Sequence, residues 1–406
     1  MSRIEDFQKW LDEVMSTIIE NLGSNVNEAR YELCRFIDYP MSTQYYINIK
    51  FKNKNGDSDE RDSDELAIML KRPTLLETNR LLNLVDYQFH NEILFYQTYA
   101  QPGENFAKCF YANERPPIDS VIALENVNKR QYCPCPYTYD APLEYTLAAF
   151  REMGRFHGKG YAMKELQRDK FFDIVKQIQE CRYDKRRYNC KNFIDIIATR
   201  AVDYLRNHGH DVTFCDKMEA LFSKAYDNVI MKAVEPREPL STLCHGDFTL
   251  SNTLFKTDNG GHRAMLIDFA LCRYSTPVVD LSSYLCLCCS NEVRKDKFFE
   301  IMRVYHDALK EYLLEAGVSN IEKYSYEALL DDFRRGGLFG FILASFYLAV
   351  LKKHGDRTDK DSHQVSSKIF NVKSGEFLKQ YGGDKISKIL ADMLLQLNDF
   401  GCLKYF

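Results

Sequence analysis

The chain has 406 residues and a formal net charge of −4, with 45% hydrophobic and 28% charged residues. This composition is typical of a globular protein in water, and the nearly balanced charge gives no electrostatic reason to expect a nucleic acid partner. The length is sufficient for two lobes. The longest uncharged run, Gly336–Leu351, is shorter than the roughly 20 residues that span a bilayer, so we expect a buried helix and no membrane span.

The 13 cysteines lack the spacing of a disulfide framework or of a zinc site. Free thiols persist in reducing compartments, which favours a cytoplasmic protein. The N-terminus is charged and amphipathic and has no apolar stretch of the signal-peptide type. We infer no obligate protein partner from the sequence.

The first 130 residues predict an antiparallel sheet with a helix inserted after its third or fourth strand. Helical periodicity covers residues 3–22. Strand-forming residues gather in "STQYYINIKF" (Ser42–Phe51), "ELAIMLKRP" (Glu65–Pro73) and "SVIALENV" (Ser120–Val127). Leu81–Tyr99 has apolar positions at helical spacing, which predicts the inserted helix.

From Ala141 onward the pattern is mainly helical, beginning with "APLEYTLAAFREMGRFHGKGYAMKEL". Two short strands interrupt it, "NTLFK" (Asn252–Lys256) and "AMLIDF" (Ala264–Phe269), joined by a turn of hairpin type. Helices resume at Pro277. The sequence therefore predicts an α+β protein, with a sheet lobe over residues 1–127 and a larger helical lobe over 128–406.

The stretch "LCHGDFTLSNTLF" (Leu243–Phe255) carries the most informative chemistry. Phosphoryl transfer from a nucleotide needs a base for the incoming hydroxyl, magnesium ligands and a lysine that holds the phosphates. The spacing predicts Asp247 as the base. Asn252 and Asp268 supply the hard oxygen ligands that Mg²⁺ prefers.

The first lobe supplies candidates for the nucleotide side of the reaction. Lys71 ends the predicted strand "LAIML", and Glu92 lies on the following predicted helix, where it can pair with the lysine. Glu125, in "ALENV", falls where the two lobes would join. Its backbone is a candidate for hydrogen bonding to adenine. We therefore predict Lys71, Glu92 and Glu125 as nucleotide-binding residues.

Together, "CHGDFTLSNTLF", "MLIDF", "LEYTLAAFREMGRFHGKGYA" and "ALENV" resemble the ecdysteroid kinase-like family, within the choline kinase and aminoglycoside phosphotransferase group. The resemblance extends over about residues 30 to 380. It implies a two-lobed protein-kinase-like fold and the use of ATP with Mg²⁺ to phosphorylate a hydroxyl group of a small alcohol such as a steroid. By motif match it implies Asp247 as catalytic base, Asn252 and Asp268 as metal ligands, and Lys71 with Glu92 as the phosphate clamp.

Two alternatives remain open. The family usually has a glycine-containing nucleotide loop where this chain has "YPMSTQYY" (Tyr39–Tyr46), without glycine. Bulky side chains keep backbone amides away from phosphates, which favours a catalytically silent binding protein with a kinase fold. The other alternative is a kinase of the choline or ethanolamine type, which would need carboxylates and an aromatic cage for the cation.

Other kinase classes fit the sequence less well. A P-loop kinase is excluded because G-x-x-x-x-G-K-[ST] does not occur. Phe269–Thr276 is too short for a peptide-docking segment, which favours a small acceptor over a protein. We also expect Asp280, at a predicted helix start, to bond to the loop that carries Asp247.

Overall fold

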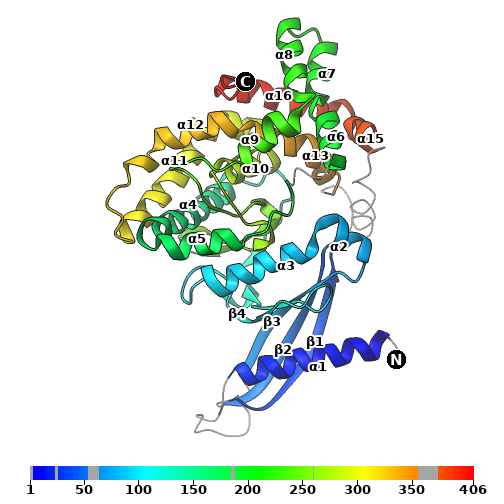
Figure 1. The fold of residues 1–406 in the computed structure, drawn as a ribbon, viewed down its shortest axis with the longest axis vertical. Helices are drawn as coiled ribbons and strands as arrows, with labels where there is room; N and C mark the ends of the chain where they lie inside the picture. The colour runs from blue at the N-terminus through cyan, green and yellow to red at the C-terminus, as the bar shows by residue number, and fades with distance from the viewer. Residues whose placement is uncertain (1–2, 23–25, 54–63, 184–187, 259, 355–373) are drawn as a thin grey trace. The chain divides into compact units, whose positions relative to one another are not determined.

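The computed structural model in Figure 1 describes residues 3–22, 26–53, 64–183, 188–258, 260–354 and 374–406. The chain divides into two compact units, Met1–Gln131 and Tyr132–Phe406. The division expected after residue 127 falls within a short 3₁₀ helix, Val127–Arg130, at the end of the first unit.

The first unit contains an antiparallel five-stranded sheet in the order β1-β2-β3-β5-β4. The helices α2 and α3 follow the third strand, as the sequence predicted. The elements are α1 (Arg3–Asn21), β1 (Val26–Asp38), β2 (Ser42–Asn53), β3 (Asp64–Pro73), α2 (Glu77–Asn83), α3 (Val85–Leu94), β4 (Cys109–Asn113) and β5 (Val121–Glu125).

Two details of this unit differ from the sequence predictions. The sequence did not indicate β1, because this strand lies at the sheet edge and most of its described side chains are at least partly exposed. The single helix expected over Leu81–Tyr99 is divided at Leu84, whose φ of 50° separates α2 from α3. A π-helical turn, Phe95–Tyr99, follows α3. The spacing of apolar residues does not reveal that the backbone of a single residue adopts a left-handed conformation.

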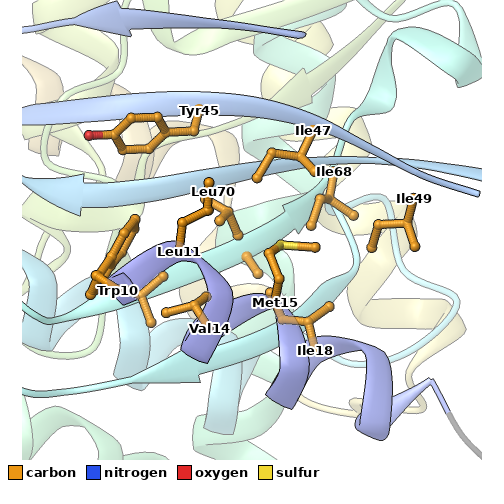
Figure 2. Packing of buried hydrophobic residues seen from close by; sticks show 12 residues of the cluster. Trp10, Leu11, Val14, Met15, Ile18, Tyr45, Ile47, Ile49, Ile68 and Leu70 are labelled. Carbon is orange, nitrogen blue, oxygen red and sulfur yellow. The ribbon is translucent and has the colours of Figure 1, made fainter. Parts of the chain in front are cut away.

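The core of the first unit lies between α1 and one face of the sheet (Figure 2). The helix contributes residues at helical spacing, and β2 and β3 contribute every second residue. The central members are Trp10, Leu11, Val14, Met15, Ile18, Tyr45, Ile47, Ile49, Ile68 and Leu70. Because side chains alternate along β3, Lys71 lies on the sheet face opposite to the one that buries Leu70.

The second unit is mainly helical and contains a hairpin, β8–β9, and a short strand pair, β7–β10. Its helices are α4 (Leu143–Leu166), α5 (Arg168–Gln177), α6 (Tyr188–Ala198), α7 (Arg200–Asn207), α8 (Val212–Phe222), α9 (Met231–Val234), α10 (Val278–Cys288), α11 (Asn291–Glu315), α12 (Tyr326–Gly336), α13 (Leu338–His354), α15 (Ser374–Gln380) and α16 (Gly383–Asp399). Its strands are β6 (Cys133–Pro134), β7 (Thr242–Cys244), β8 (Thr253–Asp258), β9 (Gly261–Leu266) and β10 (Arg273–Ser275). The predicted α+β fold class is confirmed.

The apolar run Gly336–Leu351 forms the end of α12 and most of α13, and its described side chains are mostly buried. Among the residues that the structure describes, no helix is long and apolar enough to cross a bilayer. Each cysteine whose side chain is described is a free thiol.

Candidate active site

The β8–β9 hairpin brings Asn252 and Asp268 to the same end of its ladder. Thr253 pairs with Leu266, and the backbone N–H of Ile267 donates to the carbonyl of Asn252 (3.1 Å). Asp268 follows directly with a φ of 65°, a left-handed conformation that non-glycine residues rarely adopt. Two side chains with oxygen ligands therefore flank the open end of this hairpin.

Asn252 also contacts the predicted base. Its Nδ2 donates to Oδ2 of Asp247 (2.9 Å) and to the Asp247 backbone carbonyl (3.0 Å). The Asp247 side chain is 35% exposed, so its carboxylate is accessible from solvent. Since the amide NH₂ faces Asp247, the carbonyl oxygen of Asn252 is the atom of this side chain suited to a metal ion.

The loop His245–Asn252, called here the Asp247 loop, is anchored by a buried carboxylate on α10. Oδ2 of Asp280 accepts from the backbone N–H of His245 (2.7 Å), and Oδ1 accepts from the N–H of Gly246 (2.8 Å). Burial alone would raise the pKa of Asp280, but the hydrogen bond from His157 and the nearby imidazoles hold this pKa below its ordinary value. The expected bond between Asp280 and this loop is confirmed.

His157 on α4 also contacts the Asp280 carboxylate. Its Nε2 lies 3.0 Å from Oδ2 of Asp280, and its Nδ1 lies 2.8 Å from the hydroxyl of Tyr305 on α11. The two helices approach closely at Gly154, where a Cβ would lie 2.3 Å from the carbonyl oxygen of Tyr305. The sequence placed His157 in a family motif but gave it no role, because its partners are far away in the chain.

His245 connects the Asp247 loop to the residues that precede Asp268. Its Nε2 donates to the carbonyl of Ile267 (2.9 Å), and its Nδ1 accepts from the backbone N–H of Asp247 (3.3 Å). Gly246 has a φ of 81°, and a Cβ at this position would lie 1.9 Å from the carbonyl oxygen of Leu271. Only glycine fits here without displacing the backbone.

Arg182 lies beside the predicted base, and no pattern in the sequence indicated this residue. Its Nη1 is 3.3 Å from Oδ1 of Asp247. Burial alone would lower the pKa of Arg182, but the Asp247 carboxylate together with the nearby Tyr347 and Tyr183 hydroxyls holds this pKa above its ordinary value. The guanidinium is therefore a permanent positive charge next to Oδ1 of Asp247.

In the first unit, Lys71 on β3 and Glu92 on α3 form the ion pair that we expected. Nζ of Lys71 lies 2.6 Å from Oε2 of Glu92, and the two side chains are 7% and 2% exposed. The ammonium also lies 5.9 Å from the ring centroid of Phe89. The position on the sheet face opposite to the α1 core permits this pairing.

Glu125 ends β5, and its groups are partly used within the first unit. Its backbone N–H donates to the carbonyl of Lys108 (2.8 Å). Its carboxylate accepts from the Lys108 N–H (3.3 Å) and pairs with Arg130 (3.2 Å). Because the N–H is committed, the carbonyl oxygen is the backbone group of Glu125 to consider for adenine.

The glycine-free stretch Tyr39–Tyr46 is mainly strand. Only Tyr39–Met41 forms the turn between β1 and β2, and the N–H of Tyr39 donates to the carbonyl of Ser42 (2.8 Å). Tyr39 and Met41 are 43% and 37% exposed. The tip of this hairpin therefore presents large side chains instead of the open backbone that glycine provides.

The sequence profile of the ecdysteroid kinase-like family matches residues 38–318 of the chain. No curated protein matches the sequence. Among solved structures, a microcompartment-associated aminopropanol kinase is 12% identical, with a TM-score of 0.38, and the alignment covers 96% of this chain and 99% of that one. An aminoglycoside-3'-phosphotransferase of type VIII is 13% identical over 79% and 98% of the two chains, with a TM-score of 0.33.

A thermostable mutant of an aminoglycoside phosphotransferase, solved with AMP-PNP and hygromycin B, is 14% identical to this chain. That alignment covers 85% of this chain and 99% of the phosphotransferase, with a TM-score of 0.32.

Proposed function

The chain belongs to the ecdysteroid kinase-like family, and we propose that it is an ATP- and Mg²⁺-dependent kinase for a hydroxyl group of an ecdysteroid-like or other small alcohol. One observation carries the proposal: Asp247 contacts Asn252, and the same loop is bonded to Asp280 and to the residue before Asp268. A base and two oxygen ligands in one anchored structure are what phosphoryl transfer requires.

Asp247 acts as the base in this proposal. The acceptor oxygen forms a bond to the γ-phosphorus, the bond between that phosphorus and the β-γ bridging oxygen breaks, and ADP leaves. The hydroxyl proton passes to the Asp247 carboxylate. The hydrogen bond from Asn252 orients the carboxylate, and Asp280 fixes the loop backbone, so little reorganisation is needed before transfer.

Asn252 and Asp268 fit a magnesium ion because their side chains offer hard oxygen ligands. When bound, Mg²⁺ neutralises charge on the phosphates. In the first unit, we propose the Lys71 ammonium, held by Glu92, as the cation that contacts the nucleotide phosphates. The Glu125 carbonyl is proposed to accept from the adenine amino group.

The test is ADP release by the purified chain with ATP and Mg²⁺ against ecdysteroids, other sterols, choline, ethanolamine and aminoglycosides. The controls are omission of Mg²⁺ and the variant Asp247→Ala. We expect turnover with a steroid or another uncharged alcohol, and its loss in both controls. If no acceptor is phosphorylated while ATP still raises the melting temperature, the catalytically silent binding protein replaces the enzyme.

The alternative of a catalytically silent binding protein rests on the glycine-free turn Tyr39–Met41, whose exposed side chains restrict access to the backbone amides. Replacing Met41 by Gly gives a direct check. An enzyme whose nucleotide affinity is limited by this turn should show a lower KM for ATP in Met41→Gly. An unchanged KM would mean that phosphate binding does not involve the turn.

A further inference from the structure

Arg182 and Asp247 form an ion pair of 3.3 Å between Nη1 and Oδ1, and both side chains are partly accessible, at 27% and 35%. Asn252 binds the other carboxylate oxygen, Oδ2. The two oxygens of the predicted base therefore have different surroundings, with the amide on one and a guanidinium on the other. An acceptor whose hydroxyl approaches Asp247 comes within a few ångströms of this positive charge.

The backbone around Arg182 is fixed by Glu180. Its Oε1 accepts from the backbone N–H groups of Arg182 and Tyr183, both at 2.7 Å. Its Oε2 accepts from Nη2 of Arg273 (2.6 Å). The Glu180 carboxylate thus holds the backbone of Arg182 and Tyr183 and also bonds to Arg273, so the backbone that carries Arg182 is fixed in position.

Arg273 in turn belongs to the structure that carries the base. It lies on β10, opposite Cys244 on β7, and β7 leads directly into the Asp247 loop. Its guanidinium lies 5.0 Å from the ring centroid of Tyr183, which packs edge-on against Phe339 on α13. The turn with Arg182 and the loop with Asp247 are therefore attached to the same strand pair.

Guanidinium chemistry limits what can occupy this position. Arginine presents five N–H donors, no acceptor and a permanent charge. A ligand oxygen next to the reacting hydroxyl would accept from Arg182. A ligand ammonium or quaternary nitrogen two carbons from the hydroxyl would be repelled and would have to compete with Arg182 for Asp247. This arrangement is opposite to the carboxylates and aromatic cage that a choline-type site needs.

Building on the proposed kinase activity, we propose that Arg182 is an acceptor-binding residue that selects against cations. It admits uncharged or anionic alcohols and rejects amino alcohols and quaternary ammonium alcohols. The charge that discriminates comes from this chain's own side chain beside the base, and the Glu180 turn holds it there.

The experiment compares acceptors that differ only in charge. Choline is paired with 3,3-dimethylbutan-1-ol, its uncharged carbon analogue, and ethanolamine is paired with propan-1-ol, which has a methyl group in place of the ammonium. For each pair we measure kcat/KM from ADP release. If turnover is too slow, we measure the inhibition constants against the steroid or other alcohol that the wild-type chain phosphorylates.

In the wild-type chain we expect the neutral member to be favoured by about tenfold to a hundredfold, as like charges about 6 Å apart imply. In Arg182→Gln the ratio of kcat/KM between the neutral and the cationic acceptor should fall to near one, mainly because kcat/KM for the cation rises. The KM for ATP should stay unchanged. Arg182→Lys keeps the charge and should keep most of the discrimination.

The matched control is Arg155→Gln, which removes a guanidinium of similar exposure from an ion pair with Glu315 in the same unit. It should leave the ratio unchanged. If Arg182→Gln lowers kcat equally for both members of each pair, Arg182 acts on the transferred phosphoryl group and the selection proposal is overturned. A wild-type ratio near one also overturns it. If the wild-type chain phosphorylates no acceptor at all, the proposed kinase function fails, and this proposal fails with it.

Discussion

The Lys71–Glu92 pair in the first unit and the Asp247 loop in the second are positioned in different ways. The pair joins a strand to a helix through one buried contact of 2.6 Å. The Asp247 loop begins outside any helix or strand, where its backbone N–H groups donate to Asp280 on α10 and the His245 side chain donates to the Ile267 carbonyl. The pair depends on its own two side chains, whereas the position of the loop depends on Asp280 and His157, which lie on other elements.

This difference predicts which substitutions affect both the stability of the fold and the rate of turnover. Removing one member of the Lys71–Glu92 pair leaves the other buried without a counter-charge, and replacing both members by apolar residues should restore stability. Removing an anchor of the loop should impair folding and turnover together, because the same bonds satisfy buried backbone groups and hold Asp247.

The largest loss of stability is expected for Asp280→Ala. The substitution leaves the N–H groups of His245 and Gly246 and the imidazole of His157 without their acceptor in a buried site. Breaking such a buried network costs about 3–5 kcal/mol. Urea unfolding measures the loss, and turnover should fall at least about a hundredfold because the loop is no longer held.

The matched control is Asp392→Ala on α16. This carboxylate pairs with Lys388 one helical turn away at the surface, so its removal should leave the free energy of unfolding unchanged within error. An Asp280→Ala variant as stable as this control would contradict the anchoring role.

Lys71→Met should cost about 3 kcal/mol, because Glu92 is left buried without its counter-charge. In the double variant Lys71→Met/Glu92→Leu, apolar packing replaces the pair, and stability should return to within about 1 kcal/mol of the wild type. Nucleotide use should not return, since no cation replaces Lys71. Recovery of ATP turnover in the double variant would show that the pair is only structural.

Most of the clamp could be predicted from the sequence. The alternation along β3 and the helical periodicity near Glu92 are local patterns, and they place the two side chains on facing surfaces. The division of the predicted helix at Leu84 did not matter, because it precedes Glu92.

The loop was predictable only in part. The order of Asp247, Asn252 and Asp268 indicated the chemistry, because these residues flank one hairpin. Asp280 was expected to bond to this loop, but its partner His157 was not predicted, since it comes from α4 and meets Asp280 only in the folded chain. Arg182 was not indicated because an arginine beside a basic run between helices is usually solvated. Spacing identifies residues that act through local structure and misses those that act through tertiary contacts.

Gly246→Ala isolates the effect of crowding in the loop. A Cβ at this position meets the Leu271 carbonyl oxygen at 1.9 Å, whereas Gly209, with a similarly positive φ, has open space around it. Both substitutions carry the cost of a left-handed conformation, about 1 kcal/mol. In urea unfolding, Gly246→Ala should therefore lower the free energy of unfolding by at least about 2 kcal/mol more than Gly209→Ala does. Equal losses would mean that the loop adapts easily.

The smallest expected effect is on how the free energy of unfolding depends on pH in the acidic range. Because the folded protein holds the pKa of Asp280 below its ordinary value of 3.8, the ionised carboxylate stabilises the fold. This contribution is fully present above that value and is lost as the pH falls through the lowered pKa. The difference in unfolding free energy between the wild type and Asp280→Asn should be constant from neutral pH to about pH 5 and should narrow below about pH 4. If this difference in unfolding free energy already narrowed near neutral pH, the pKa of Asp280 would not be lowered in the folded protein.

The most direct test is to measure ATP affinity and acceptor phosphorylation together for the wild type and for Asp247→Asn, with folding checked by circular dichroism. Asparagine keeps the size of the side chain but cannot take the proton. We predict unchanged ATP affinity within about threefold and a fall in kcat of about a thousandfold. Turnover within tenfold of the wild type would show that Asp247 is not the base, and the proposed function of the loop would be wrong.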